Sequence, residues 1–407
     1  MNFLFAWRYF RAKKSTNAIN IIAWVSIVAI VIGASSLVLV LSVFNGFEDL
    51  VKSLYSSFYT DLKISPVSGK TILLGADQLK RISGLPGIRA YSLVAEDKAF
   101  LQNGELQSIV YLKGVDENYG RVTSLPEKVV RGKFDLGSSE YPDIVLGAGI
   151  ENALEIESEK NIIPLSVYLF KKTGNLNPAD PMQSVSNENM ATTGTFVIQQ
   201  EFDNKYAFTN LLFMQHMLGL QPDEYSAVEI ALTDPKQGPE VVAGLQNLLG
   251  KDYRVETRYE QNQALYNVMR TEKWVIYGVL TLILIVSAFN MIGALTMLVL
   301  EKQKDIHVLK ALGANNGYIQ RIFLSEGILL ATLGGVAGIL LALLICWLQV
   351  RYKLVPLAGG SFLIDYYPVK LVPGDFLLVF ATIFIVALIA SWFPSRKAAL
   401  QPVELRS

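Results

Sequence analysis

The sequence has 407 residues, of which 51% are hydrophobic and only 18% are charged. Lys and Arg together number 36, as do Asp and Glu, so no net charge favours binding to nucleic acid. With one cysteine and two histidines, the chain offers neither a disulfide framework nor a Cys/His metal cluster.

Long apolar runs dominate the two ends of the chain, and each is long enough to cross a bilayer as a helix. The first is too long for a signal-peptide core, so we expect it to remain as a permanent span. The runs predict an α-helical membrane protein with four transmembrane helices. They are Ile21–Phe44, Trp274–Leu300, Ile322–Val350 and Phe376–Pro394.

The segment between the first two runs has the composition of a soluble domain and is large enough to bury its own core. We therefore divide the chain into residues 1-47, 48-272 and 273-407. A strand–helix–strand unit is predicted at each end of the middle segment, which favours an α/β subdomain (about 48-113 and 224-272) with an inserted β-rich subdomain (about 114-223). The predicted strands are Asp61–Ser65, Ala90–Val94, Gln107–Lys113, Asp143–Leu146, Thr195–Gln199, Ser226–Leu232 and Tyr253–Glu256. The predicted helices are Ala76–Ser83, Gly147–Leu154, Thr209–Leu218 and Pro239–Leu249.

Two features of the middle segment bear on function. Lys171–Met190 is polar, carries two prolines and interrupts regular elements, so we interpret it as a functional loop or a disordered one. His216 falls near two methionines on a predicted helix, and we expect it to pack against the domain and not to be catalytic.

The connector between the second and third spans, Glu301–Gly317, is charged but carries an apolar stripe. Ile306, Leu309 and Leu312/Gly313 follow helical spacing, and Gly313 is the residue type expected just beyond a helix end. An amphipathic helix at this position suits docking into a groove on another protein. The alternative is an interfacial helix that lies on the lipid headgroups.

Basic residues predict the orientation of the chain. They gather before the first span (Arg8, Arg11, Lys13, Lys14), in the connector and in the tail after the fourth span. Short Lys/Arg-rich segments stay on the cytoplasmic side, so both termini and the connector are expected there and the large domain outside.

The sequence contains no Gly-x-Ser-x-Gly elbow and no His-Glu-x-x-His motif. The phosphate-loop candidate Ser68-Gly69-Lys70-Thr71 has Ile64 where the first glycine is required, so we reject it. We therefore expect no catalytic site, no metal and no cofactor on this chain. In the third span, Gly334 and Gly338 form a small-residue pair that either packs on another helix or is incidental.

Three stretches carry a resemblance to a known family. They are Arg8-Tyr9-x-Arg11, Leu41-Ser42-Val43-Phe44-Asn45-Gly46-Phe47-Glu48, and Glu301-Lys302-x-Lys304-Asp305-Ile306-x-Val308-Leu309-Lys310-Ala311-Leu312-Gly313-Ala314. They resemble the permeases of the lipoprotein-releasing ABC transporter, the LolC/LolE family, within the wider FtsX/MacB-type permeases. The layout of one span, a large outer domain and three further spans is similar over the whole chain.

The resemblance implies a bacterial inner-membrane permease that transmits motion. A separate ABC ATPase subunit, which binds the ATP, would dock on a coupling helix at 301-313 through Glu301, Lys304, Ile306, Leu309, Ala311, Leu312 and Gly313. A second permease, identical or homologous, would complete a cavity open to membrane lipids. Ser42, Phe44 and Phe47 would form the rim that contacts the acyl chains of a lipoprotein. A periplasmic lipoprotein chaperone would bind a hook at Asn175–Asn189, including Asn177, Pro178, Pro181 and Met182.

Three other functions compete with this interpretation. A MacB-type exporter permease carries its ATPase on the same chain, which this sequence lacks. An FtsX-like signal transducer that regulates a cell-wall hydrolase has a smaller outer domain. A membrane enzyme acting on lipids would need a catalytic constellation, and the sequence shows none.

Overall fold

The computed structural model describes residues 17–158, 164–172, 185–357 and 366–401. They fall into two compact units. The first unit lies within residues 1–50, 267–358 and 364–407, and the second is formed mainly by residues 51–266. We describe each unit separately.

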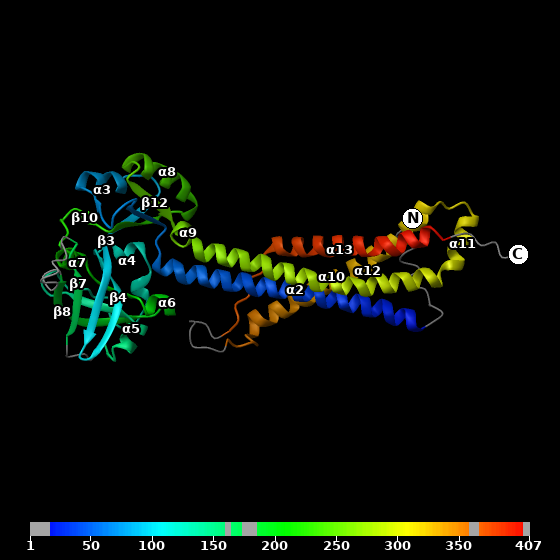
Figure 1. The fold of residues 1–407 in the computed structure, drawn as a ribbon, viewed down its shortest axis with the longest axis horizontal. Coiled ribbons are helices and arrows are strands. Elements are labelled where there is room, and N and C mark those ends of the chain that lie inside the picture. The colour runs from blue at the N-terminus through cyan, green and yellow to red at the C-terminus, as the bar shows by residue number, and fades with distance from the viewer. Residues whose placement is uncertain (1–16, 159–163, 173–184, 358–365, 402–407) are drawn as a thin grey trace, which may run out of the picture. The chain divides into compact units, whose positions relative to one another are not determined.

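The first unit is a bundle of long apolar helices, drawn with their labels in Figure 1. Among the described residues, four helices are long and apolar enough to cross a membrane, which confirms the four predicted transmembrane helices. Two of them continue well beyond the apolar runs, because the polar residues that follow Phe44 and precede Trp274 are also helical. The four are α2 (Asn17–Phe58), α10 (Gln263–Glu301), α12 (Asn316–Tyr352) and α13 (Pro373–Ala399).

Small residues allow the bundle helices to approach closely. A Cβ added at Gly338 would lie 2.7 Å from the Cβ of Ala34, and one at Gly334 would lie 2.9 Å from the Cβ of Ile30. The structure therefore places both glycines of the predicted pair against α2. A Cβ at Gly327 would lie 2.3 Å from the Cβ of Ser391, so α12 and α13 also meet at a small residue.

The second unit is built on a ten-stranded sheet with the order β12-β1-β11-β3-β4-β9-β6-β8-β5, and β7 pairs with β3 and β8. A separate two-stranded sheet pairs β10 with β2. The strands are β1 (Leu62–Pro66), β2 (Ile72–Leu73), β3 (Ile88–Asn103), β4 (Leu106–Val115), β5 (Val129–Gly132), β6 (Asp143–Gly147), β7 (Leu165–Phe170), β8 (Val185–Phe196), β9 (Tyr206–Asn210), β10 (Glu224–Tyr225), β11 (Ala227–Leu232) and β12 (Tyr253–Thr257). The helices of this unit are α3 (Ala76–Ser83), α4 (Tyr119–Val122), η1 (Leu125–Lys128), α5 (Ala148–Ala153), α6 (Gln200–Asp203), α7 (Leu211–Leu218), η3 (Pro235–Gln237), α8 (Gly238–Leu249) and α9 (Arg258–Gln261).

One part of the sheet follows the ferredoxin-like pattern. The units β1–α3–β3 and β11–α8–β12 are the two strand–helix–strand units expected from the sequence. Their strands lie in the order β12-β1-β11-β3, and all of the pairs are antiparallel. This is the split βαβ arrangement.

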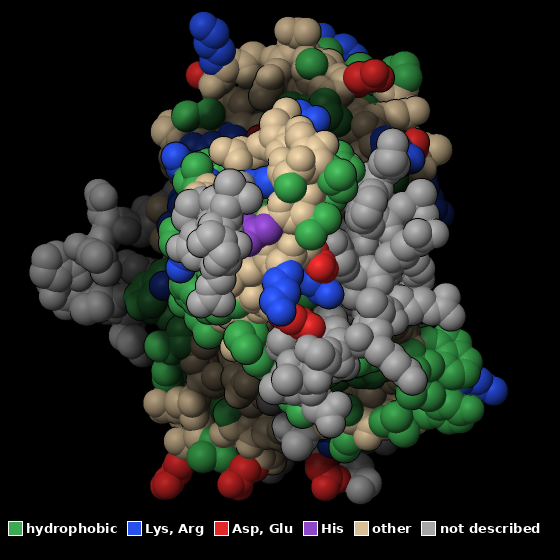
Figure 2. Space-filling model, turned by 90° about the vertical axis from the view of Figure 1, so that its right-hand side faces the viewer, with side chains coloured by type: hydrophobic (Ala, Val, Ile, Leu, Met, Phe, Trp, Pro, Cys, Tyr) green, Lys and Arg blue, Asp and Glu red, His purple; other side chains and the backbone are tan. Residues whose placement is uncertain are grey.

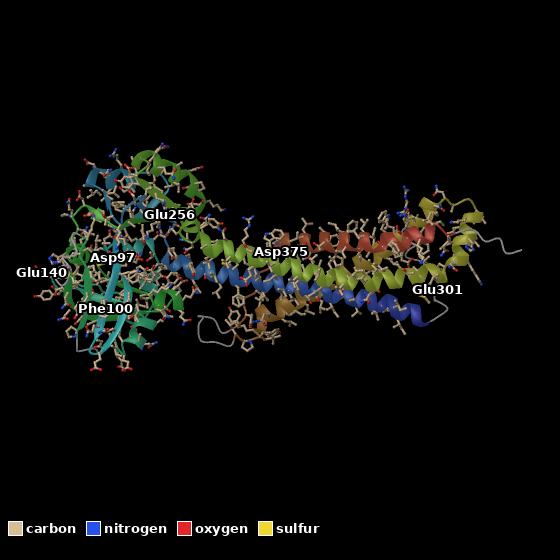
Figure 3. All side chains as sticks on the ribbon, in the orientation of Figure 1. Asp97, Phe100, Glu140, Glu256, Glu301 and Asp375 are labelled. Atoms are coloured by element: carbon tan, nitrogen blue, oxygen red, sulfur yellow. The ribbon has the colours of Figure 1, made fainter. Side chains whose placement is uncertain are left out.

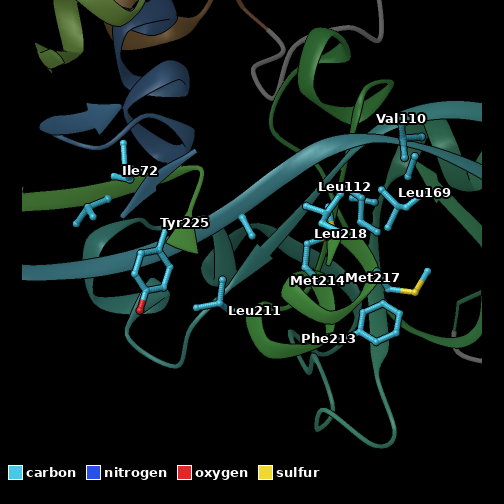
Figure 4. Packing of buried hydrophobic residues seen from close by; sticks show 14 of the residues in the cluster. Ile72, Val110, Leu112, Leu169, Leu211, Phe213, Met214, Met217, Leu218 and Tyr225 are labelled. Carbon is cyan, nitrogen blue, oxygen red and sulfur yellow. The ribbon is translucent and has the colours of Figure 1, made fainter. Parts of the chain in front are cut away.

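Helix α7 covers the sheet next to β4, as Figure 4 shows. Leu211, Met214 and Met217 belong to the buried core of this unit. Gly114 makes room for this contact, because a Cβ there would lie 2.3 Å from the Cβ of Met214. His216 is exposed, so the expectation that it packs is wrong. The helix turns its methionines inward and this histidine outward.

The structure corrects the predicted elements around residue 180. Strand β7 was missed, and β8 begins at Val185, inside the segment predicted to be a loop. The pairing runs from Leu165 opposite Met190 to Phe170 opposite Val185. The strand predicted at Thr195–Gln199 is the end of β8, which stops at Phe196.

The last turns of α2 are embedded in the second unit. The ring of Phe58 stacks on that of Phe202, with 4.4 Å between centroids. The hydroxyl of Tyr55 donates a hydrogen bond of 2.7 Å to Glu201, and Tyr55 is 5% exposed. The last turns of α2 therefore pack against α6 within the second unit.

Candidate functional site

The connector between α10 and α12 contains the helix α11 (Gln303–Ala311), which we call the coupling helix. Figure 3 labels Glu301, where α10 ends. Lys302 leaves helical geometry at the start of α11 and forms an ion pair of 3.4 Å with Asp305. A short independent helix thus forms where the sequence predicted one.

The apolar residues of the coupling helix point in two directions. Ile306 is 1% exposed and belongs to the bundle core, and Leu309 packs against that core. The assignment of Ile306 to the docking surface is therefore wrong, because it is buried among its own helices. Val308 and Leu312 are 60% and 80% exposed, and Lys304, Ala311 and Gly313 are exposed as well.

The coupling helix is also fixed to the end of α13. The ammonium group of Lys310 donates hydrogen bonds of 2.9 Å to the carbonyl of Ala399 and 2.6 Å to that of Gln401. Gly313 has a φ of +93°, so it turns the chain in the left-handed region that favours glycine. Asn315 then caps α12 by accepting a hydrogen bond of 2.8 Å from the backbone of Tyr318.

A pocket of about 560 Å³ lies at the turn from α11 to α12. Its lining combines apolar side chains of the coupling helix with the polar side chains of the following turn. On the end of the bundle that carries α11, charged side chains of both signs lie among hydrophobic ones (Figure 2). Such a mixed surface suits a protein partner and supplies no reacting group. The pocket is lined by Leu309, Leu312, Gly313, Ala314, Asn315, Gly317, Tyr318 and Arg321.

A second pocket, of about 550 Å³, lies at the other end of the bundle and is almost wholly apolar. We call it the apolar pocket. The side-chain amide of Gln349, at its edge, is taken up by hydrogen bonds to the backbones of Val355 and Tyr367. The remaining lining residues are Leu39, Val40, Val43, Ile345, Cys346, Leu348, Leu354, Val355, Tyr367 and Val369.

The predicted lipid rim lies beside this pocket, on other faces of α2. Ser42 is 3% exposed, and its hydroxyl donates to the carbonyl of Val38 within the same helix. It therefore cannot contact a lipid chain here, which corrects that assignment. Phe44 and Phe47 are half-buried, and Phe47 packs edge-on against Tyr367 with 5.7 Å between centroids.

The predicted hook lies mostly outside the described residues. Asn177, Pro178, Pro181 and Met182 fall between residues 173 and 184, and Val185–Asn189 belong to β8. Phe170 and Val185 line a pocket of about 650 Å³ that extends along β3, where Figure 3 labels Asp97 and Phe100. Lys70, from the rejected phosphate-loop candidate, forms an ion pair of 2.8 Å with Asp97 at this pocket.

Comparison with known proteins assigns the family. The family model for the MacB-like periplasmic core domain matches residues 23–248, and the FtsX-like permease C-terminal model matches residues 277–403. The chain is 29% identical to the lipoprotein-releasing system transmembrane protein LolC of Neisseria meningitidis, over 98% of both chains. It is 29% identical to LolE of Haemophilus influenzae, over 100% of this chain and 99% of that one. The chain belongs to the LolC/LolE permease family.

As a LolC/LolE permease with four membrane-length helices, the protein is a multi-pass inner-membrane protein. A more distant relative is the pyoverdine export ATP-binding/permease protein PvdT of Pseudomonas syringae, at 25% identity. The alignment covers 98% of this chain but only 58% of PvdT. The LolC/LolE chains therefore match this permease along their whole length, whereas PvdT is considerably longer.

Several residues at these sites were missed by sequence reasoning. Lys310 was used only as a basic residue of the connector and as part of the family motif, although it ties the coupling helix to α13. Leu39, Val40 and Val43 line the apolar pocket, and a helical projection of the first span would have placed them on one face. Asn45 was quoted within a motif but given no role, and it is 4% exposed.

Proposed function

We propose that the chain is the permease subunit of an ATP-driven ABC transporter that releases lipoproteins from the bacterial inner membrane. The observation that carries the proposal is the full-length similarity to LolC and LolE, combined with a coupling helix that leaves Val308 and Leu312 exposed beside a pocket. The coupling helix and both termini face the cytoplasm, and the second unit faces the periplasm.

A separate ATPase subunit docks on the coupling helix. An apolar side chain that is 80% exposed, such as Leu312, gains stabilisation when a partner covers it. The pocket beside it accepts a side chain of the ATPase, and the ATP is bound by that subunit. A second permease, identical or homologous, forms the other half of the transporter.

Motion of the ATPase passes through the helices to the periplasmic unit. Lys310 links the coupling helix to α13, and α2 is one continuous helix whose last turns are gripped by the second unit. Energy input is needed because removing acyl chains from a bilayer costs about 0.8 kcal/mol for each CH₂. A lipoprotein with several acyl chains therefore does not leave spontaneously.

The apolar pocket supplies the acyl-contacting surface on this chain. Its lining offers almost no hydrogen-bonding group, so it favours a hydrocarbon chain over water or a polar ligand. Leu39, Val40 and Val43 are the contact residues on α2, with Phe44 and Phe47 beside them. A periplasmic chaperone then receives the lipoprotein at the hook region and the adjoining surface around Phe170.

A second candidate is a MacB-type exporter, favoured by the similarity to PvdT. Depletion of the protein in cells distinguishes the two. Lipoproteins retained in the inner membrane support lipoprotein release, whereas correct sorting together with loss of a small-molecule export activity supports the exporter. Stalled cell-wall cleavage with correct sorting would instead indicate an FtsX-like transducer.

The docking proposal has its own test. Leu312→Asp in the purified complex of permease and ATPase is expected to lower ATP hydrolysis stimulated by the permease at least tenfold, with the fold unchanged. His307→Ala, a substitution on the same helix, serves as the matched control for nonspecific effects on this segment. If Leu312→Asp leaves both the complex and its hydrolysis intact, the docking surface lies elsewhere.

A further inference from the structure

Asn45, near the end of the apolar part of α2, bridges two oppositely charged residues from other spans. Its amide nitrogen donates a hydrogen bond of 2.5 Å to the carboxylate of Asp375 on α13. Its amide oxygen accepts one of 2.8 Å from the ammonium group of Lys273 on α10. Asn45 is buried, so this three-residue node joins three membrane-spanning helices through one side chain.

The residues that follow Asn45 hold the segment before α13, residues 366–372, which we call the strap. A Cβ at Gly46 would lie 2.3 Å from the carbonyl oxygen of Pro368, so only glycine allows the strap to pass this close. Phe47 packs on Tyr367, and the backbone of Lys370 donates a hydrogen bond of 2.9 Å to the carbonyl of Ser42. The side chain of Lys370 also pairs with Asp49.

The strap forms one wall of the apolar pocket. Tyr367 and Val369 line it from the strap, and Leu39, Val40 and Val43 line it from α2. Moving the strap away from α2 therefore opens the pocket on that side.

The two charges of the node form an ion pair that does not depend on Asn45. In the structure, Lys273 lies 3.5 Å from Asp375 while Asn45 bridges them. If Asn45 withdraws, the two charges are already close enough to pair directly. Leaving a partly buried charge without a partner is strongly unfavourable. Direct pairing avoids that cost, so α2 can part from α10 and α13 without stranding a charge.

A pivot for such a movement lies deeper in the bundle. Gly334 and Gly338 of α12 seat directly on Ile30 and Ala34 of α2. Because no side chain on α12 separates the helices there, α2 can rotate about this contact. The three-residue node holds α2 nearer its other end.

We propose that Asn45 is a positioning residue that latches α2 and the strap together in the resting transporter and releases them during the ATP-driven cycle. The identity of the ATP-driven cycle rests on the proposed function. The contacts that form the latch belong to the permease chain alone. The substitution of Asn45 therefore changes how tightly the strap lies on α2, and release of the strap is a required step of transport.

The first experiment measures the latch without substrate. Phe47→Cys and Tyr367→Cys are introduced together into the full chain in lipid nanodiscs, and a short, reducible thiol crosslinker joins them. The native Cys346 is 1% exposed, and the chain with Cys346 alone controls for its reaction. We expect Asn45→Leu to lower the crosslinking yield at least threefold. Ser35→Ala is the matched control, because the hydroxyl of Ser35 bonds only its own helix, at Ile32, and its yield should not change.

Asn45→Asp is a second variant, which keeps the test valid if Asn45→Leu fails to fold. Above the pKa of the new carboxyl group, its charge repels Asp375, and the yield should fall although Lys273 and the neighbouring Lys370–Asp49 pair remain. At a pH below the pKa of the new carboxyl group, its protonated form donates a hydrogen bond to Asp375, and the yield should recover towards that of wild type. Equal yields for wild type, Asn45→Leu and Asn45→Asp both above and below this pKa would overturn the latch.

The second experiment tests release of the strap. Adding the ATPase and a non-hydrolysable ATP analogue should lower the crosslinking yield, and a complex crosslinked beforehand should release a labelled triacylated lipopeptide at least tenfold more slowly. A reductant should restore the rate. Crosslinked complexes that release the lipopeptide at the uncrosslinked rate would show a static contact and refute the proposal. If uncrosslinked complexes do not release lipopeptide at all, the proposed function fails, while the response of the yield to ATP still decides the latch.

Discussion

Lys113 and Glu229 form an ion pair in the interior of the second unit. The ammonium nitrogen lies 2.6 Å from the carboxylate oxygen, and the side chains are 2% and 5% exposed. Lys113 is on β4 and Glu229 on β11, with β3 between them. The ammonium group also lies 5.1 Å from the ring centroid of Phe58, the last residue of α2. The pair therefore joins the ferredoxin-like part of the sheet, the remainder of the sheet and the end of the first span.

We expect Glu229→Ala to lower the free energy of unfolding of the second unit by about 3–5 kcal/mol, because it removes the carboxylate that pairs with the buried charge of Lys113. The double variant Lys113→Met/Glu229→Leu should lose much less, since no charge remains. Thermal unfolding of the full chain in detergent, followed by near-UV circular dichroism, measures both. Lys70→Met is the control, because its ion pair with Asp97 is exposed and worth less than about 1 kcal/mol.

Ile306 lies on the coupling helix and Leu312 caps its C-terminal end, but the two should respond differently to substitution. Ile306→Ala removes a fully buried side chain and is expected to destabilise the bundle by about 2–5 kcal/mol. Leu312→Ala should leave the melting temperature within about 1 °C of wild type, because a surface substitution changes stability by only a few tenths of a kcal/mol. Equal losses of stability would contradict the burial that distinguishes the two residues.

Gly338 should tolerate no side chain. An alanine methyl group there would meet Ala34 and the backbone of Val31 at 2.7 Å, so Gly338→Ala is expected to cost about 1–3 kcal/mol of bundle stability. Gly293→Ala on α10 is the matched control, since nothing lies within 4 Å of a Cβ there. That variant should be neutral or slightly stabilising because alanine favours helix. The melting temperatures of the two variants in the same nanodisc provide the comparison.

Asp203 should make stability depend on pH in the mildly acidic range. Burial raises the pKa of this carboxyl from 3.8 to about 6, although the backbone amides of Ile198 and Gln199 donate hydrogen bonds that oppose the rise. Between these two values the folded state binds more protons than the unfolded state, so stability falls as pH rises through the window. The loss is on the order of 2 kcal/mol for a side chain this buried.

Asp203→Asn removes the titration. Unfolding midpoints measured from pH 4 to pH 7 should therefore decline less steeply for the variant than for wild type. The difference between the two curves isolates this residue from the other titrating groups. Parallel curves would mean that Asp203 keeps its ordinary pKa.

The amino-acid sequence predicts those parts of the structure that depend on local pattern. Apolar runs of membrane length predicted the spans, and the i, i+3 spacing with Gly313 predicted the coupling helix. The direction of Ile306 could not be predicted, because an apolar stripe has the same pattern whether its own bundle or a partner covers it. Strand β7 was missed although Leu165, Val167 and Leu169 alternate with less buried residues, because the segment is short and lies next to a polar stretch.

The three-residue node of Asn45, Lys273 and Asp375 could not be predicted from the sequence, for a different reason. Asn45 is separated from Lys273 by 228 positions and from Asp375 by 330, so only the packing of the bundle brings them together. A lone asparagine at the end of an apolar run is compatible with exposure to water. Its burial became visible only with the neighbouring helices in place.

The attachment of Lys310 to the carbonyls of Ala399 and Gln401 has a practical consequence for handling the protein. Ala399 is the last residue of α13 and Gln401 lies two positions beyond it, so a purification tag or fluorescent protein fused close behind Gln401 would pull on the same carbonyls. Fusions placed there should be separated from Gln401 by a flexible linker. Without one, binding of the ATPase would be measured on a connector that the fusion has displaced.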